Sequence, residues 1–307
     1  MSISRPFRTF DYALVDVFAE RPLEGNMLAI FTDARGLTTD EMQALARETN
    51  LAETTFILPA EDPAQELAHG VRVRIFTTEE ELPFAGHPTL GTASWLFWNH
   101  PALKGAREIT LDLKGGSVTV RFDLPAGDEP GVFGTMRQHD PIFGQIHEPE
   151  EVAQATGIAL QDLDTSLPIQ TVSTGLAFCI LPVRSLAAIA HLAVPQAKAK
   201  PYLAKSDAKF FYAFTRATES SGADFHARMQ FYNGEDPATG SASGCAISYL
   251  VRNGLVASGC RAVLEQGIEI KRPSRIFVEA SLTDGKVGHV FVGGRTISVA
   301  SGSFSLP

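Results

Sequence analysis

Apolar and polar positions in the first sixty residues alternate between strand-like and helix-like spacing. YALVDVF (12–18) and the end of RPLEGNMLAIF (21–31) predict two strands joined by a Pro/Gly turn. TTDEMQALARETN (38–50) has helical spacing, and Thr38 and Glu41 are spaced as a capping box at its start. LAETTFILP (51–59) becomes strand-like in its second half. Glu53 is therefore predicted to lie on the turn between this helix and the next strand.

The following segment predicts a strand, VRVRIF (71–76), and then a buried helix beginning near FAGHPTLGTA (84–93). Gly86 and His87 stand where the loop becomes the helix N-terminus, and Pro88 suits the first positions of a helix. Free backbone N–H groups and the positive end of the helix dipole favour an anion there. A His at such a position is also a common capping or packing residue, so the motif alone does not assign a role.

The second half of the chain repeats this motif. ELPFAGH (81–87) aligns without gaps with EDPATGS (235–241), at an offset of 235 minus 81, or 154 residues. The matched pairs are Glu81 and Glu235, Pro83 and Pro237, Gly86 and Gly240, and His87 and Ser241. The same offset pairs Arg74 with Arg228, Leu96 with Leu250 and Asn99 with Asn253. The repeat predicts a duplicated unit, with two equivalent helix N-termini facing one cleft.

The remaining pattern predicts an α+β fold with much antiparallel sheet. Hairpins are expected at 109–124 around Gly115–Gly116 and at 275–294 around Asp284–Gly285. RTISVASGSFSL (295–306) predicts a final strand pair whose last strand, near 296–306, packs back on the N-terminal domain. The Pro/Gly-rich stretch LPAGDEPGVFG (124–134) suggests a domain boundary.

Composition and charge narrow the class of protein. The 307 residues are 44% hydrophobic and 20% charged, which is typical of a globular chain. The net charge of −9 and the absence of a basic run disfavour nucleic acid and acidic membrane surfaces as partners. Three cysteines without a CxxC spacing, no signal-like N-terminus and no long apolar run favour a cytoplasmic protein outside the membrane.

Four side chains are candidates for chemistry in the predicted cleft: Glu53, His87, Asp236 and Ser241. Asp236 also suits a turn or a helix cap, and Ser241 also suits a cap. Glu53 has apolar sequence neighbours, which would raise its pKa as a general acid/base requires. Histidine spacing gives no metal site, and no G-x-G-x-x-G follows a strand, so neither a metal nor a dinucleotide is expected.

Several motifs together resemble the PhzF family of phenazine-biosynthesis isomerases. They are VDVFAERPLEGNMLAIF, ETNLAETTFILP, RIFTTEEELPFAGHPTLGTA, EDPATGSASG and QGIEIKRPSRIFV, in this order. The resemblance implies a diaminopimelate-epimerase-like fold. That fold has two pseudo-symmetric domains, each a mostly antiparallel sheet wrapped around a central helix. The domains would be residues 1–130 joined by the C-terminal strand 296–307, and residues 131–295.

The resemblance also implies an activity: a cofactor-independent isomerase, generally a homodimer, that acts on a small carboxylate-bearing substrate. Phenazine enzymes of the family move a proton between carbons of trans-2,3-dihydro-3-hydroxyanthranilate. The family's acid/base Glu corresponds to Glu53, and its other catalytic residues correspond to His87, Asp236 and Ser241. Gly86 and Gly240 would bind substrate through their N–H groups. The chain departs from the family pattern at Ala52, where phenazine enzymes have Ser, and in a shorter segment at 229–237. Both departures leave the acid/base residues in place, but the substrate then cannot be carried over from the family.

Two other functions stay open at this point. Epimerases and racemases of this fold use one thiol at each helix start, whereas this chain has His87 and Ser241 there. A non-catalytic small-molecule-binding protein on the same scaffold would not require Glu53. The sequence therefore favours the isomerase and leaves its substrate unidentified.

Overall fold

Segments with alternating apolar and polar residues form a large sheet in the computed structural model, which describes residues 7–123, 130–231 and 234–307. The strands are β1 (Arg8–Val17), β2 (Asn26–Phe31), β3 (Thr54–Ile57), β4 (Val71–Phe76), β5 (Glu81–Leu82), β6 (Glu108–Leu113), β7 (Gly116–Asp123), β8 (Val132–Arg137), β9 (Ile142–Ile146), β10 (Gln170–Ser173), β11 (Ala177–Pro182), β12 (Phe210–Thr215), β13 (Phe225–Arg228), β14 (Gln230–Phe231), β15 (Gly234–Glu235), β16 (Arg261–Gln266), β17 (Ser274–Thr283) and β18 (Lys286–Leu306). The helices are α1 (Thr39–Thr49), α2 (Pro63–His69), α3 (Gly86–Asn99), α4 (Pro149–Thr156), α5 (Leu186–Ala190), α6 (Gln196–Leu203) and α7 (Gly240–Arg252), with a 3₁₀ turn at Leu160–Asp162.

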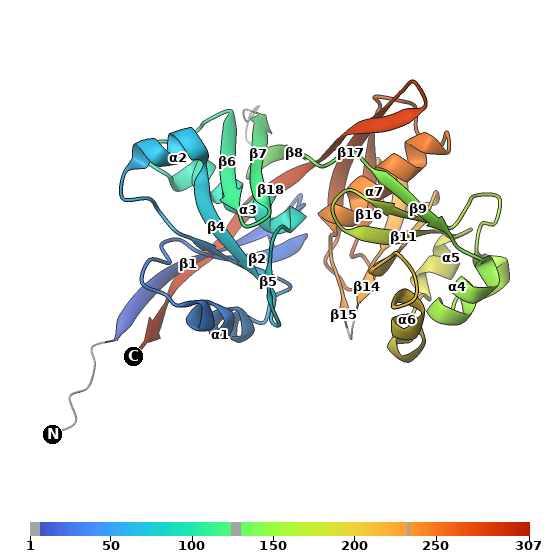
Figure 1. Cartoon of the computed structure of the whole chain (residues 1–307), viewed down its shortest axis with the longest axis horizontal. Helices are drawn as coiled ribbons and strands as arrows, with labels where there is room; N and C mark the ends of the chain where they lie inside the picture. The colour runs from blue at the N-terminus through green and yellow to red at the C-terminus, as the bar shows by residue number, and fades with distance from the viewer. Residues whose placement is uncertain (1–6, 124–129, 232–233) are drawn as a thin grey trace.

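The main sheet surrounds α3 on one side of the molecule and α7 on the other (Figure 1). Its strand order is β1-β2-β3-β4-β6-β7-β8-β18-β17-β16-β13-β12-β11-β10-β9, and β1 also pairs with β18. That extra pairing closes the strands from β1 to β8, together with β18, into a ring. The strands from β18 to β9 form the open part of the sheet. The hairpin of β14 and β15 is separate from the main sheet.

Both enclosed helices are apolar on nearly all sides, as expected for helices in the centre of a core. In α3 and α7, eleven residues each are buried. Helix α3 packs against strands of the ring, including β1, β2, β6 and β8, whereas α7 packs against β17, β18, β11 and β10. Helices α3 and α7, which the sequence repeat matches to each other, thus lie in equivalent surroundings.

Strand β18 runs through both halves of the molecule as one strand of 21 residues. Its residues 286–293 pair with β17, and residues 296–306 pair antiparallel with β1. The predicted final strand pair at 295–306 is therefore wrong, because these residues continue β18 as a single strand and residues 296–306 pair with β1. A Cβ at Gly293 would lie 2.7 Å from Gly134 O, and one at Gly294 would lie 2.4 Å from Phe18 Cδ1, so these glycines allow close packing.

Other local predictions can be compared directly with the structure. Thr38 and Glu41 form the predicted capping box of α1, and Glu53 lies between α1 and β3. Pro88 is the third residue of α3, because the helix already begins at Gly86. Helix α2 was not predicted. Most of the proposed boundary stretch, residues 124–129, lies outside the described residues.

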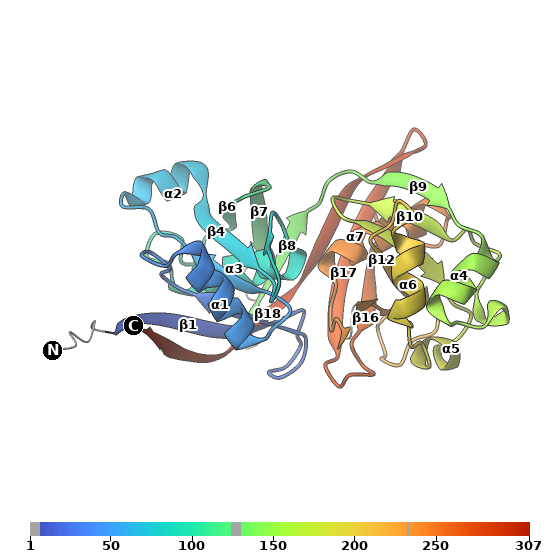
Figure 2. The ribbon, with the colours of Figure 1, turned by 60° about the horizontal axis from the view of Figure 1, so that its bottom comes forward.

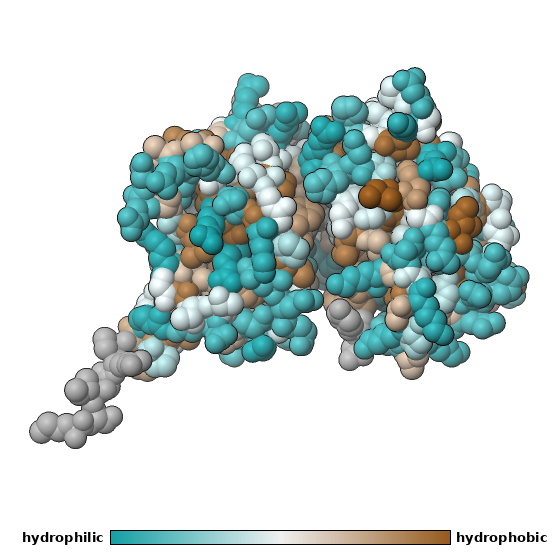
Figure 3. Space-filling model, viewed as in Figure 1, coloured by the Kyte–Doolittle hydropathy of each residue, from teal (hydrophilic) through white to brown (hydrophobic). Residues whose placement is uncertain are grey.

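The outer helices lie around the sheet, with α1 and α2 on the first half and α4, α5 and α6 on the second (Figure 2). On the face seen in Figure 3, polar residues cover most of the surface and apolar residues form scattered patches. None of the described helices combines the length and the apolar character that crossing a bilayer would require.

Candidate active site

The N-termini of α3 and α7 meet where the two halves of the chain join. Each helix begins with a glycine, Gly86 or Gly240, and continues with His87 or Ser241 as its second residue. A Cβ at Gly86 would lie 3.2 Å from Ser241 N, and one at Gly240 would lie 3.7 Å from the Cα of Gly86. The two helix starts are therefore in contact, and glycine makes this approach feasible.

Backbone N–H groups at both helix starts lack capping side chains. Neither α3 nor α7 has a side-chain hydrogen bond from its N-cap residue. The first intrahelical bonds are donated by Thr89 to Ala85 O at 3.3 Å and by Ser243 to Thr239 O at 2.9 Å. The preceding N–H groups point toward the helix ends, where the positive ends of two helix dipoles come together. This arrangement favours a negatively charged group.

Glu53 and His87 lie close together at the start of α3. The turn after α1 brings Glu53 Oε2 to 3.6 Å from His87 Nδ1, with the two side chains 18% and 4% exposed. Burial, and then the neighbouring charge of Asp236, raise the pKa of Glu53 to about 8. Burial lowers the pKa of His87 to about 3, so the imidazole is neutral at physiological pH.

Asp236 lies in the loop before α7 and is held by three neighbours. Its Oδ1 accepts a hydrogen bond from Asn26 Nδ2 at 2.6 Å, and its Oδ2 accepts one from Thr239 Oγ1 at 2.7 Å. Gln266 Nε2 donates to the Asp236 carbonyl at 2.7 Å. Burial raises the pKa of Asp236 to about 6, although both side-chain hydrogen bonds act in the opposite direction. Glu53 and Asp236 therefore titrate as a coupled pair of carboxyl groups.

The structure brings together at this junction the six candidate residues from the sequence: Glu53, Gly86, His87, Asp236, Gly240 and Ser241. This observation concerns their positions and assigns no role to them. Glu53, His87 and Asp236 interact as described, and Gly86 lies against Gly240 and Ser241. Ser241 is half-buried and is not the N-cap of α7, a position that Thr239 occupies. Among residues 7–123, 130–231 and 234–307, no group of three or more His, Cys, Asp or Glu side chains could hold a metal ion.

Sequence reasoning missed the amide side chains that support this arrangement. Asn26, at the start of β2, contacts both Asp236 and His87. Gln138 Nε2 donates to Gly240 O at 2.8 Å and thereby fixes the first residue of α7. A Cβ at Gly244 would lie 1.9 Å from Gln138 Oε1, so this glycine makes room for the amide. Only the position of Asn26 directly after a Pro/Gly turn gave any signal in the sequence.

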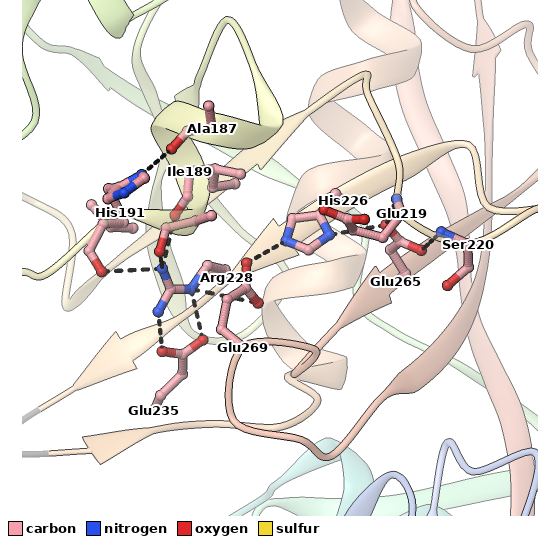
Figure 4. Close-up of polar contacts among 12 residues, drawn as sticks. Ala187, Ile189, His191, Glu219, Ser220, His226, Arg228, Glu235, Glu265 and Glu269 are labelled. Carbon is pink, nitrogen blue, oxygen red and sulfur yellow. Dashed lines mark hydrogen bonds and ion pairs between the residues drawn. The ribbon is translucent and has the colours of Figure 1, made fainter.

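A buried charged network fixes the β14–β15 hairpin that leads into Asp236 (Figure 4). Arg228 forms a two-pronged ion pair with Glu235, at 2.8 Å from Nε and 2.5 Å from Nη2. Glu269 connects Arg228 to His226, whose other ring nitrogen is 2.9 Å from Glu265. The network places Glu235 firmly, and Glu235 precedes Asp236.

The first half contains the matching ion pair. Arg74 Nε and Nη2 lie 2.8 and 3.0 Å from the two carboxylate oxygens of Glu81. Arg74 and Glu81 correspond to Arg228 and Glu235 at the 154-residue offset seen in the sequence (228 minus 74, and 235 minus 81). The repeat therefore includes the side-chain interactions that precede each of the two helices.

The geometry allows proton transfer next to an anion site. A carboxyl group with a pKa near neutrality can both accept and donate a proton, and a neutral imidazole can donate a hydrogen bond. The helix N-termini can stabilise negative charge that develops on a bound molecule.

Comparisons with known proteins show the family to which the chain belongs. Residues 15–302 match the PhzC-PhzF family, described as phenazine biosynthesis-like protein. The chain is 34% identical to an uncharacterized isomerase of Mesorhizobium japonicum, covering 96% of this chain and 98% of the relative. It is 33% identical to trans-2,3-dihydro-3-hydroxyanthranilate isomerase of Pseudomonas chlororaphis, covering 96% and 99%. A predicted epimerase from Pseudomonas aeruginosa shares its mixed α/β fold, with a TM-score of 0.80, 38% identity and coverage of 96% and 99%. The chain is thus an isomerase that belongs to the PhzC-PhzF family.

Proposed function

We propose that this isomerase moves a proton between two carbons of a small carboxylate-bearing substrate, without a cofactor, and that Glu53 is its general acid/base. The observation that carries the proposal is the raised pKa of Glu53 beside two uncapped helix N-termini. A single group must first accept the proton and then return it. A carboxyl group that is half-ionised near neutral pH serves both steps.

In the proposed reaction, the ionised Glu53 takes a proton from an acidic C–H bond. The electron pair of that bond moves into the conjugated system of the substrate, and the protonated Glu53 then delivers the proton to another carbon of that system. No atom is lost or gained. The N–H groups of Gly86 and Gly240 would bind the substrate carboxylate, and His87, Asp236 and Ser241 would orient the substrate and stabilise the negative charge.

The proposed substrate class is a cyclic carboxylate similar to dihydro-hydroxyanthranilate. The relative from Pseudomonas chlororaphis is named for that substrate, and it is matched over nearly its whole length. Phenazine enzymes have Ser where this chain has Ala52, the residue next to Glu53. This difference would change the contacts with the substrate and leave the proposed acid/base residue in place. We further propose two domains, 1–130 with 296–307 and 131–295, and a cytoplasmic homodimer.

Deuterium uptake tests this function. The protein is incubated in D₂O with trans-2,3-dihydro-3-hydroxyanthranilate, with other cyclic carboxylates and with amino acids, and each compound is analysed by mass spectrometry and NMR. Incorporation together with a shifted double bond supports the proposal. Incorporation with inversion at one carbon would instead identify an epimerase. A compound that binds tightly and exchanges no hydrogen would indicate a non-catalytic binding protein.

A further inference from the structure

The β1–β2 turn brings Asn26 to the junction of the two halves. Gly25 N–H donates to Pro273 O at 2.9 Å, and Arg272 Nε donates to Gly25 O at 3.0 Å. Gly25 has a φ of 70°, and a Cβ there would lie 2.4 Å from Val17 O, so the turn requires glycine. The backbone just before Asn26 is therefore bonded to the second half of the chain, and its buried side chain has a defined position.

The amide nitrogen of Asn26 has three neighbours but only two hydrogens. Nδ2 lies 2.6 Å from Asp236 Oδ1, 3.0 Å from Ala238 O and 3.3 Å from His87 Nδ1. A side-chain amide nitrogen donates and does not accept hydrogen bonds. The two oxygens take the shorter bonds, and His87 Nδ1 faces the same donor group.

This contact selects one neutral tautomer of His87. The two amide hydrogens bond to Asp236 and Ala238, and the amide nitrogen itself cannot accept, so a hydrogen on Nδ1 would find no acceptor at this contact. The contact with Asn26 therefore favours the tautomer in which Nδ1 carries a lone pair and Nε2 carries the hydrogen. Glu53 Oε2, 3.6 Å from Nδ1, favours the same tautomer when Glu53 is protonated.

The selected tautomer leaves a donor without a partner. His87 Nε2 is buried and has no hydrogen-bond partner in the described structure. A buried N–H group that is left unpaired is unfavourable, and a bound molecule with an acceptor would satisfy it. The orientation of His87 is thus suited to donating a hydrogen bond through Nε2.

We propose that Asn26 is a positioning residue that keeps His87 in the Nε2–H tautomer and holds the carboxylate of Asp236 across the two halves of the chain. The consequence for catalysis rests on the proposed function, whereas the tautomer and the Asp236 contact exist without substrate. The proposal can therefore be tested on the free protein.

Nitrogen-15 NMR of the histidine rings is the direct test of the tautomer. The His87 signals are assigned by their loss in His87→Gln, and their shifts report which ring nitrogen carries the hydrogen. We expect the wild-type protein to show a protonated Nε2 and an unprotonated Nδ1 at neutral pH. The opposite pattern in the wild-type protein would overturn the proposal.

Asn26→Asp replaces the amide donor with a carboxyl oxygen of nearly the same shape. We expect the hydrogen of His87 to move to Nδ1, so that the signals of the two ring nitrogens exchange their positions. Asn99→Asp is the matched control, because it makes the same chemical change at the exposed end of α3, where Asn99 donates to Trp95 O. An unchanged His87 in a folded Asn26→Asp protein would contradict the proposal.

Asn26→Leu tests the contact with Asp236 without adding charge. Loss of a hydrogen bond to the ionised carboxylate should raise the pKa of Asp236, as followed by carbon-13 NMR of its carboxyl carbon. An Asp236 titration identical to that of the wild-type protein would refute the positioning role. None of these measurements uses turnover, so a failure of the proposed isomerase reaction would remain distinguishable from a failure of this inference.

Discussion

Glu53 and His87 have protonation states set mainly by burial. Each neutral form is favoured because the surroundings offer little solvation for a charge, and Asp236 adds repulsion to an ionised Glu53. Near neutral pH the site therefore holds a partly protonated Glu53 and a neutral His87. That combination can exchange protons with a bound molecule and donate a hydrogen bond to it.

Glu53→Gln should stabilise the folded protein increasingly as the pH rises. The pKa of Glu53 is raised from an ordinary value of 4.5 to about 8, so the folded state retains a proton that the unfolded state releases. The stability that protonated Glu53 contributes to the wild-type protein is fully present below about pH 4.5 and falls as the pH rises toward 8. The difference between variant and wild type should grow by at most about 1.4 kcal/mol per pH unit in this range.

Denaturant unfolding at several pH values measures this effect. Glu48→Gln is the control, because Glu48 is an exposed glutamate near the end of α1 and its replacement removes the same charge. The pH-dependent change predicted for Glu53→Gln should exceed any change seen with this control. A flat difference for Glu53→Gln would show that Glu53 titrates normally in the folded protein.

The sequence pointed to the residues for which we propose a chemical role, but it did not show the residues that support them. Glu53, His87 and Asp236 stand in recognisable motifs near predicted element boundaries, so their positions could be inferred. Asn26 contacts His87, 61 residues away in sequence, and Gln138 contacts Thr174 and Gly240, which are 36 and 102 residues away. Such contacts depend on tertiary packing, which no local pattern encodes.

At the level of elements, the repeated ion pairs allow a matched comparison. Arg228 and Glu235 are 6% and 7% exposed, whereas Arg74 and Glu81 are 20% and 17% exposed. Glu235→Gln leaves a buried arginine without its full partner, which should lower the free energy of unfolding by about 3 kcal/mol. Glu81→Gln should cost less, because water can reach Arg74. Equal losses in urea unfolding would contradict this dependence on burial.

The contact between the two helix starts gives a second prediction at this scale. Gly86→Ala adds a Cβ 3.2 Å from the backbone nitrogen of Ser241, so the start of α7 must shift. Misplacement of binding groups by about 1 Å can cost on the order of 10² in rate, and a smaller shift should cost correspondingly less. Gly234→Ala is the control, since a Cβ there meets no atom of the described residues within 4 Å. Comparing kcat for both variants tests the idea, which fails if Gly86→Ala is as active as the control.

Element prediction succeeded where periodicity was the deciding signal. The capping box and apolar face of α1 identify that helix directly. The strand pair predicted at 295–306 was wrong, because these residues belong to one long strand, β18, whose end pairs with β1. Strand β1 is distant in sequence, so no local pattern shows this pairing.

On the scale of the whole molecule, the two halves are joined by β18 and by a buried ion pair. Arg272 Nη2 lies 2.7 Å from Asp16 Oδ1, and Asp16 is buried in β1. Arg272→Met removes the cation and leaves that carboxylate unpaired, which should destabilise the protein by on the order of 3 kcal/mol. Arg275→Met removes only exposed hydrogen bonds to Ser221 O and Gly222 O and should have a small effect.

Calorimetry of these two variants reports on the connection between the halves. Because β18 runs through both, we expect one unfolding transition in Arg272→Met, displaced to lower temperature. Two separate transitions would show that the ion pair, rather than the shared strand, couples the halves. An unchanged Tm would show that Asp16 needs no cation.

Turnover by Glu53→Gln shows whether Glu53 transfers the proton. Gln preserves the shape of the side chain and cannot act as a base. With a substrate identified by deuterium uptake, kcat should fall by about 10² to 10⁴ while the substrate still binds. Near-normal turnover and deuterium incorporation by Glu53→Gln would show that another group transfers the proton.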